Sequence, residues 1–128
     1  MFSAIAIDHV QSPRNRGPLQ GATHVGTGGS PGEGPYARLW LIVEDGRIVD
    51  ASYKTPGCPS STACASVLCQ LISGRDVQLC RMLTNADLLA VVGGLPEGKD
   101  YWIDHVMAAL NDALNCHENP TKDSSELE

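Results

Sequence analysis

The stretch YARLWLIVEDGRIVDASY, residues 36–53, decides the fold. Strand-forming residues fill Tyr36–Val43, the turn at residues 44–47 contains a glycine, and Ile48–Tyr53 alternates apolar with polar side chains. Two such runs joined by a short glycine-containing turn are typical of a β-hairpin. We expect Thr23–Val25 to add a third strand, and the glycine-rich run from Gly26 to Pro35 to form a flexible loop.

Helical patterns lie on both sides of this hairpin. Ser3 precedes a short apolar pattern that Pro13 ends. After the hairpin, Ser60 or Ser61 is expected to cap a helix that ends at Gly74. Further downstream, the sequence predicts a capping box of Thr84 and Asp87 and a last helix that follows Asp100. The apolar stripe of that last helix consists of Ile103, Val106, Met107, Leu110 and Leu114.

A helix, then antiparallel strands, then several helices indicate the α+β class. We therefore expect a three-stranded antiparallel sheet with an N-terminal helix and several C-terminal helices packed on it. Residues 1–118 are expected to form a single domain, and the polar residues 119–128 a disordered tail.

Composition excludes several classes of function. The 128 residues are 42% hydrophobic and 19% charged, which is ordinary for a soluble globular domain. A net charge of −6 argues against binding of nucleic-acid phosphates. From the N-terminal residues, which lack a basic start, we expect no secretory signal, and no apolar run reaches the roughly 20 residues that a membrane crossing needs. We expect a cytoplasmic protein with reduced thiols.

Cys58 is the most informative single residue. It lies between a glycine and a proline, where a strand ends and a helix begins. The free N–H groups and the dipole of a helix start favour a thiolate, which is both a nucleophile and a soft metal ligand. The alternative is a small buried cysteine in a turn. Cys64, Cys69 and Cys80 are expected in the core, because no pair has the spacing of a zinc or cluster chelate.

Two histidines have simpler interpretations than metal binding. His9 is expected to cap the first helix or to anchor the loop that follows it. His105 lies beside the apolar stripe of the last helix, and we expect a solvated or core residue there.

Three motifs together resemble the IscU/NifU N-terminal family of iron–sulfur cluster assembly scaffolds. They are HVQSPRNRG at residues 9–17, KTPGC at residues 54–58 followed by SSTA at residues 60–63, and LPEGK at residues 95–99 before the last helix. They occur in the family's order and spacing, and the likeness covers residues 1–116. The resemblance implies the α+β scaffold fold, which agrees with the pattern of strands and helices.

The resemblance also implies where cluster ligands would lie. In the family, three cysteines assisted by an aspartate and a histidine hold the cluster, and Cys58 matches the second cysteine. The first cysteine and the aspartate fall at Glu33-Gly34-Pro35, and the family's His-Cys pair falls at Tyr101-Trp102. Cys58 is thus the one retained ligand, with Glu33 as a candidate oxygen ligand. The residues expected to line the site are Gly34, Pro35, Lys99, Tyr101 and Trp102.

Three functions follow from this resemblance. The first is a non-enzymatic scaffold in which binding of iron or of a transient iron–sulfur cluster is weakened or depends on a second subunit. The second is a sulfur carrier whose Cys58 accepts persulfide sulfur from a cysteine desulfurase. The third is a partner-binding module without chemistry at Cys58. Tyr101 and Trp102 would form an apolar lid over Cys58 or a contact surface for other cluster-assembly proteins.

Overall fold

The structure is a computed structural model that describes residues 3–12, 15–30, 32–96 and 98–115. Its elements follow one another in the order α1 (Ala4–Gln11), β1 (His24–Gly29), β2 (Tyr36–Glu44), β3 (Arg47–Lys54), α2 (Pro59–Ile72), α3 (Val77–Arg81), α4 (Asn85–Val92) and α5 (Tyr101–Asn115).

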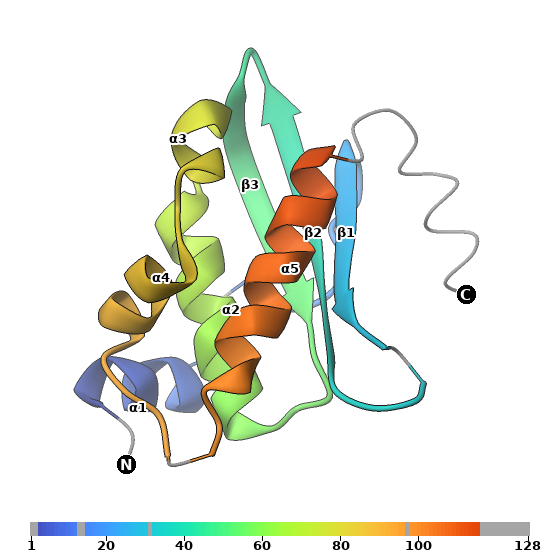
Figure 1. The fold of residues 1–128 in the computed structure, drawn as a ribbon. Helices are drawn as coiled ribbons and strands as arrows, with labels where there is room; N and C mark the ends of the chain where they lie inside the picture. The colour runs from blue at the N-terminus through green and yellow to red at the C-terminus, as the bar shows by residue number, and fades with distance from the viewer. Residues whose placement is uncertain (1–2, 13–14, 31, 97, 116–128) are drawn as a thin grey trace.

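The three strands form one antiparallel sheet in the order β1-β2-β3. In the register, Val25 pairs with Trp40 and Leu41 pairs with Ala51. Helices α2 and α5 cover one face of this sheet, α2 against β3 and α5 against β1 and β2, while α1 and α4 pack on α2 (Figure 1). The α+β architecture and the central hairpin expected from the sequence are confirmed.

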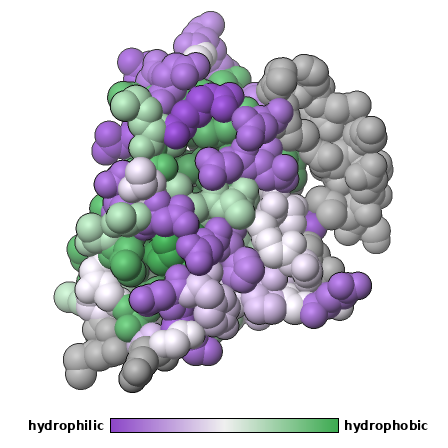
Figure 2. All heavy atoms as spheres, viewed as in Figure 1, coloured by the Kyte–Doolittle hydropathy of each residue, from purple (hydrophilic) through white to green (hydrophobic). Residues whose placement is uncertain are grey.

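The core lies between the sheet and helices α2 and α5. Every residue of the apolar stripe expected in α5 is buried, which confirms that this helix docks on the sheet. Helix α2 is buried on most of its surface, because the sheet, α1, α4 and α5 all contact it. On the face seen in Figure 2, apolar side chains gather over α4, where Val91 is 37% exposed.

Strand β1 is longer than expected, because part of the predicted glycine-rich loop belongs to it. Gly26 and Gly28 pair with β2 and face α5 at very close range. A Cβ on Gly26 would collide with the backbone of Ala109 and Ala113, and one on Gly28 with the carbonyl of His105. The glycines therefore permit close packing of strand and helix, rather than flexibility.

Helix α1 buries a different face from the apolar one that its sequence suggests. Ser3 caps the helix as expected, by accepting a hydrogen bond from the Ala6 N–H at 3.0 Å. The buried residues are Ala6 and His9, whereas Ile5 and Ile7 are 48% and 43% exposed. The orientation follows from polar anchors: Ser3 also donates to the carbonyl of Val92, and His9 bonds to α2.

Helix α2 begins earlier than the sequence suggests. Its N-cap is Cys58 and its first residue is Pro59, so that Ser60 and Ser61 lie inside the first turn rather than at the cap. The fixed φ of proline suits this first helical position. The capping box of Thr84 and Asp87 is present as predicted.

The short helix α3 is an element that the sequence patterns do not predict. Asp76 caps it by accepting a hydrogen bond from the Gln78 N–H at 2.7 Å.

The predicted tail at residues 119–128 lies outside the described residues. Among the described helices, none has the length and apolar character that a membrane crossing requires.

Candidate functional site

Three segments that carry the expected site residues lie at the same end of the molecule (Figure 1). They are the loop between β1 and β2, the junction between β3 and α2, and the start of α5. Antiparallel pairing places the β1–β2 loop and the end of β3 at one end of the sheet, and both long helices begin there. The topology thus gathers segments that are up to about 70 residues apart in the chain.

Cys58 is held at the start of α2 by its backbone. Its carbonyl accepts hydrogen bonds from the Thr62 N–H at 2.9 Å and from the Ser61 hydroxyl at 2.8 Å. Gly57 before it has a φ of 95°, a backbone conformation that residues other than glycine rarely adopt. The Cys58 side chain makes no capping hydrogen bond and is half-buried, packed against the core. The sulfur therefore lies at the strand-to-helix junction that the sequence predicts.

The other described cysteines are core residues, as expected. Cys64 and Cys69 are fully buried and Cys80 is 3% exposed. Burial is the largest cause that raises the pKa of each thiol, in the case of Cys64 to about 12. These three thiols are therefore protonated at neutral pH and unsuited to nucleophilic attack. Cys116 lies outside the described residues.

One carboxylate near this site was not assigned to it from the sequence. After burial, the Asp100 carboxylate and then the Cys58 thiol contribute to the raised pKa of Cys64. Both groups therefore lie near the Cys64 sulfur, and they come from different ends of the chain. The available signal was the position of Asp100, directly after the LPEGK motif that ends at Lys99. The sequence alone predicts Asp100 only as the start of the last helix.

The aromatic pair at the start of α5 forms a small cluster with His105. The ring centroids of Tyr101 and Trp102 are 5.2 Å apart, and those of Trp102 and His105 are 5.5 Å apart. Trp102 is 3% exposed, and its indole N–H has no hydrogen-bond partner in the described part of the chain. Tyr101 is 38% exposed, so part of the pair faces solvent. The expected lid over Cys58 stays a prediction.

The β1–β2 loop presents its residues to solvent. Glu33, Gly34 and Pro35 are all exposed. The loop closes on itself through two backbone hydrogen bonds of 3.0 Å, from the Glu33 N–H to the Ser30 carbonyl and from the Ser30 N–H to the Pro35 carbonyl. Lys99 is half-buried and its carbonyl accepts from the Trp102 N–H at 3.2 Å.

The topology places the candidate ligands at one end without closing them into a chelate. Over residues 3–12, 15–30, 32–96 and 98–115, no three His, Cys, Asp or Glu side chains come together as a metal-binding group. Within the described residues, the site offers the half-exposed Cys58 thiol, an exposed carboxylate, Glu33, on the neighbouring loop and another, Asp100, directly before α5. The assignments of Glu33, Lys99 and the aromatic pair to a site stay predictions.

Comparison with known proteins identifies the family. The family model described as the NifU-like N terminal domain matches residues 1–123. The chain belongs to the NifU-like N-terminal domain family. The resemblance inferred from the three motifs is thereby confirmed.

Similar proteins of this family share about a third of their residues with the chain. It is 38% identical over 116 residues to the nitrogen fixation protein NifU of Cereibacter sphaeroides, covering 91% of this chain and 47% of that protein. It is 32% identical over 114 residues to the iron-sulfur cluster assembly scaffold protein IscU 1 of Archaeoglobus fulgidus, and the match covers 89% of this chain and 74% of that protein. The chain thus spans less than half of that NifU and about three quarters of that IscU.

Solved structures support the fold. The N-terminal domain of a nitrogen-fixing NifU-like protein from Brucella abortus superimposes with a TM-score of 0.58 at 16% identity, covering 98% of this chain and 95% of that one. The FiSufU protein of Fervidobacterium islandicum gives a TM-score of 0.62 at 18% identity, and the match covers 91% of this chain and 96% of that one. The arrangement of helices on a three-stranded sheet is therefore a known one.

Proposed function

We propose that this NifU-like chain acts in iron–sulfur cluster assembly as a scaffold with a reduced set of ligands. The observation that carries the proposal is the position of Cys58, backbone-held at a helix start, in a chain whose relatives include proteins named cluster assembly scaffolds. Iron or a transient cluster would be the cargo of such a protein. It would not be an enzyme.

The reduced ligand set limits what one copy of the chain can hold. Iron–sulfur clusters are held by several thiolates. Among the described residues, Cys58 is the half-exposed thiol, and Cys64 nearby is buried and protonated. Glu33 and Asp100 would add oxygen ligands, which suit a cluster poorly. We therefore expect that stable cargo binding needs a ligand from a second polypeptide.

The partners follow from this role. Cluster assembly needs a source of sulfur, which points to a cysteine desulfurase or to other cluster-assembly proteins as partners. The half-exposed Tyr101 beside Trp102 provides an aromatic contact of the kind that protein interfaces favour. A cytoplasmic location stays a prediction.

Anaerobic reconstitution tests the scaffold function. The chain is incubated with ferrous iron, cysteine and a cysteine desulfurase, and cluster formation is followed by visible absorbance and by iron content. We expect a weak, labile cluster that is lost in Cys58→Ser and kept in Cys80→Ser, the matched control at a buried thiol on α3. Failure of the chain to bind the desulfurase and to form any cluster would contradict the proposal.

A second function is favoured by one observation, the difference in exposure between Cys58 and the buried thiols. As a sulfur carrier, the Cys58 thiolate would attack the outer sulfur of a desulfurase persulfide. A new sulfur–sulfur bond forms on Cys58, the sulfur–sulfur bond of the desulfurase breaks, and its cysteine leaves as a thiolate. Two-electron sulfur transfer of this kind needs no further oxidant or reductant.

Mass spectrometry separates the two functions. After incubation with desulfurase and cysteine without iron, a carrier gains the mass of one sulfur atom on the peptide that contains Cys58. A scaffold that receives sulfur only as cluster sulfide shows no such gain. If neither a cluster nor a persulfide forms while the desulfurase still binds, the third function, a partner-binding module, takes their place.

A further inference from the structure

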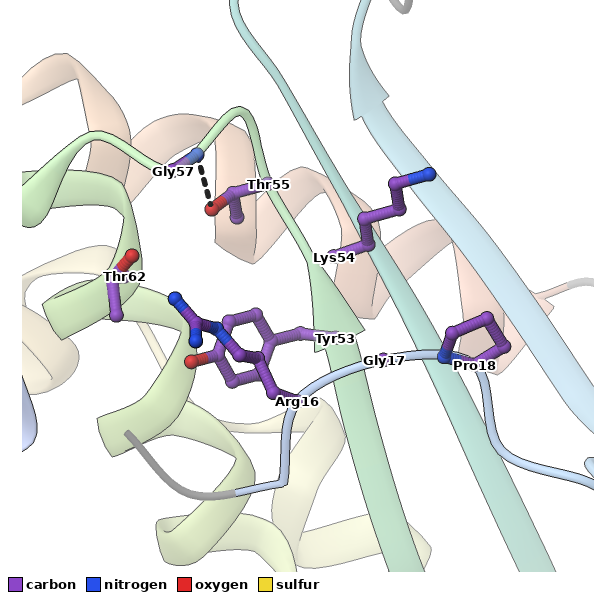
Figure 3. A pocket seen from close by; sticks show the side chains of 8 residues that line it. All are labelled: Arg16, Gly17, Pro18, Tyr53, Lys54, Thr55, Gly57 and Thr62. Atoms are coloured by element: carbon purple, nitrogen blue, oxygen red, sulfur yellow. Dashed lines mark hydrogen bonds between the residues drawn. The ribbon is translucent and has the colours of Figure 1, made fainter. Parts of the chain in front are cut away.

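A pocket of about 280 Å³ lies beside the junction of β3 and α2 (Figure 3). Its wall is formed by the end of β3, the first turn of α2 and the segment that follows α1. The lining residues are Arg16, Gly17, Pro18, Tyr53, Lys54, Thr55, Gly57 and Thr62. None of them carries a carboxylate, although the chain as a whole has a net charge of −6.

The backbone fixes Arg16 at the rim of this pocket. The Gly17 N–H donates to the Tyr53 carbonyl at 2.7 Å, and the Tyr53 N–H donates to the Asn15 carbonyl at 2.9 Å. Arg16 thereby forms a parallel bridge to Tyr53 at the edge of the sheet. Asn15 and Gly17 on either side have positive φ values of 63° and 96°, which shape the turn around Arg16. The backbone on either side of Arg16 is thus held against β3 by hydrogen bonds.

Tyr53 places a buried polar atom at the same point. The residue is 1% exposed, and the side chains of Arg16 and Ser66 lie near its hydroxyl, although none of the described residues forms a hydrogen bond of standard geometry with it. In Figure 3 this hydroxyl and the Arg16 guanidinium point toward each other, on the side of the pocket where Thr62 lies. Buried hydroxyl groups in folded proteins are normally hydrogen-bonded, so this incomplete pairing calls for an explanation.

The protonation state of the Tyr53 hydroxyl suits it to donate a hydrogen bond. Burial raises the pKa of the tyrosine hydroxyl, and the nearby Arg16 charge opposes this effect only in part. The hydroxyl therefore keeps its proton at neutral pH and can donate it to a bound acceptor.

We propose that this pocket binds a small anionic molecule through its carboxylate or phosphate group, which is held by Arg16 and the Tyr53 hydroxyl. A guanidinium matches both groups with paired hydrogen bonds. The ammonium group of Lys54 points away from Tyr53 in Figure 3, so that it contributes long-range attraction rather than a contact. The pocket is smaller than the roughly 300–1,000 Å³ typical of drug-sized ligands, which restricts the ligand to a small metabolite. The proposal does not depend on any chemistry at Cys58.

Titration of amide NMR spectra tests this site. The probes are inorganic phosphate and propionate, each compared with sodium chloride at equal ionic strength, and the reporters are the amides of Gly17 and Gly57. We expect saturable shifts of these amides with at least one probe. The probe that binds more tightly then identifies the anionic group.

Variants separate this pocket from general charge attraction. Arg16→Gln should weaken binding by roughly tenfold or more, because it removes a hydrogen bond to a charged group. Tyr53→Phe should weaken it as well, with the ring preserved. Arg47→Gln, at the opposite end of β3, is the matched control and should leave binding unchanged. Arg16 is exposed, so its variant is expected to fold even if Tyr53→Phe does not. The absence of saturable shifts with both probes, or equal losses in Arg16→Gln and Arg47→Gln, would overturn the proposal.

Discussion

Cys58 differs from its neighbours in the property that governs thiol reactivity, which is access. It is half-exposed, while Cys64, Cys69 and Cys80 are buried and their thiols have raised pKa values. We therefore expect Cys58 to react with iodoacetamide faster than these three in the folded protein at neutral pH. A time course of labelling with peptide mapping measures this order, and unfolded protein serves as the control in which the thiols label alike. If Cys58 labels as slowly as Cys64, the aromatic pair seals the site and sulfur transfer is excluded.

The buried thiols also predict how stability changes in alkali. The pKa of Cys64 rises from 9.0 to about 12 in the folded protein, chiefly through burial. Between these two values the unfolded chain releases the proton while the folded chain keeps it, so the free energy of unfolding falls as pH rises. Urea unfolding from neutral pH to above pH 9 should show this fall. Cys64→Ala should reduce the slope, whereas an unchanged slope would indicate that Cys64 ionises in the folded state.

At the scale of elements, the contact between β1 and α5 depends on glycine. A Cβ on Gly28 would collide with the α5 backbone at His105, which cannot move aside as a side chain does. Overpacking of this kind costs about 1–3 kcal/mol, and we expect Gly28→Ala to lower the free energy of unfolding by at least that amount. Gly34 is the matched control, because a Cβ there would meet open space and its φ is not positive. Equal stability of Gly28→Ala and Gly34→Ala in urea titrations would refute the close packing.

The packing of helix α5 on the sheet leads to a second prediction at this scale, which concerns the stability of the fold. Leu110 is fully buried in the core between α5 and the sheet. Leu110→Ala should reduce the free energy of unfolding by about 2–5 kcal/mol, the usual range for a buried leucine. Leu79→Ala, at a side chain that is 60% exposed on α3, is the control and should change stability little. A loss below about 1 kcal/mol for Leu110→Ala would mean that α5 is not docked as described.

At the scale of the whole molecule, the described residues place the half-exposed Cys58 thiol at one end of the fold without gathering three candidate metal ligands into a group. We expect the purified chain alone to retain zinc or iron only weakly after dialysis, because a lone thiolate lacks the partners of a tetrahedral site. Metal content by elemental analysis, with and without Cys58→Ser, measures this. Tightly held stoichiometric metal that disappears in Cys58→Ser would show that further side chains of this chain bind the metal together with Cys58.

Local patterns in the sequence were sufficient for much of this fold. The hairpin follows from strand-forming runs around a glycine turn, the capping box from Thr84 and Asp87, and the buried stripe of α5 from its helical spacing. Each of these features depends on residues a few positions apart, and the interactions or spacing that define it lie within one segment of the chain. The position of Cys58 at a strand-to-helix junction was predicted on the same basis.

The tertiary structure alone decided what depends on residues far apart in the chain. The sequence alone predicts a loop at the glycines of β1, and only their contact with α5 explains why they belong to the strand. The buried face of α1 is set by partners on α2 and α4 rather than by its own apolar side chains. The nearness of Asp100 to Cys64, and of Arg16 to Tyr53, has the same origin. Local propensity fixes the elements because their hydrogen bonds close within each segment. Which side chains meet is fixed only when the elements pack, because that choice minimises the free energy of the whole core.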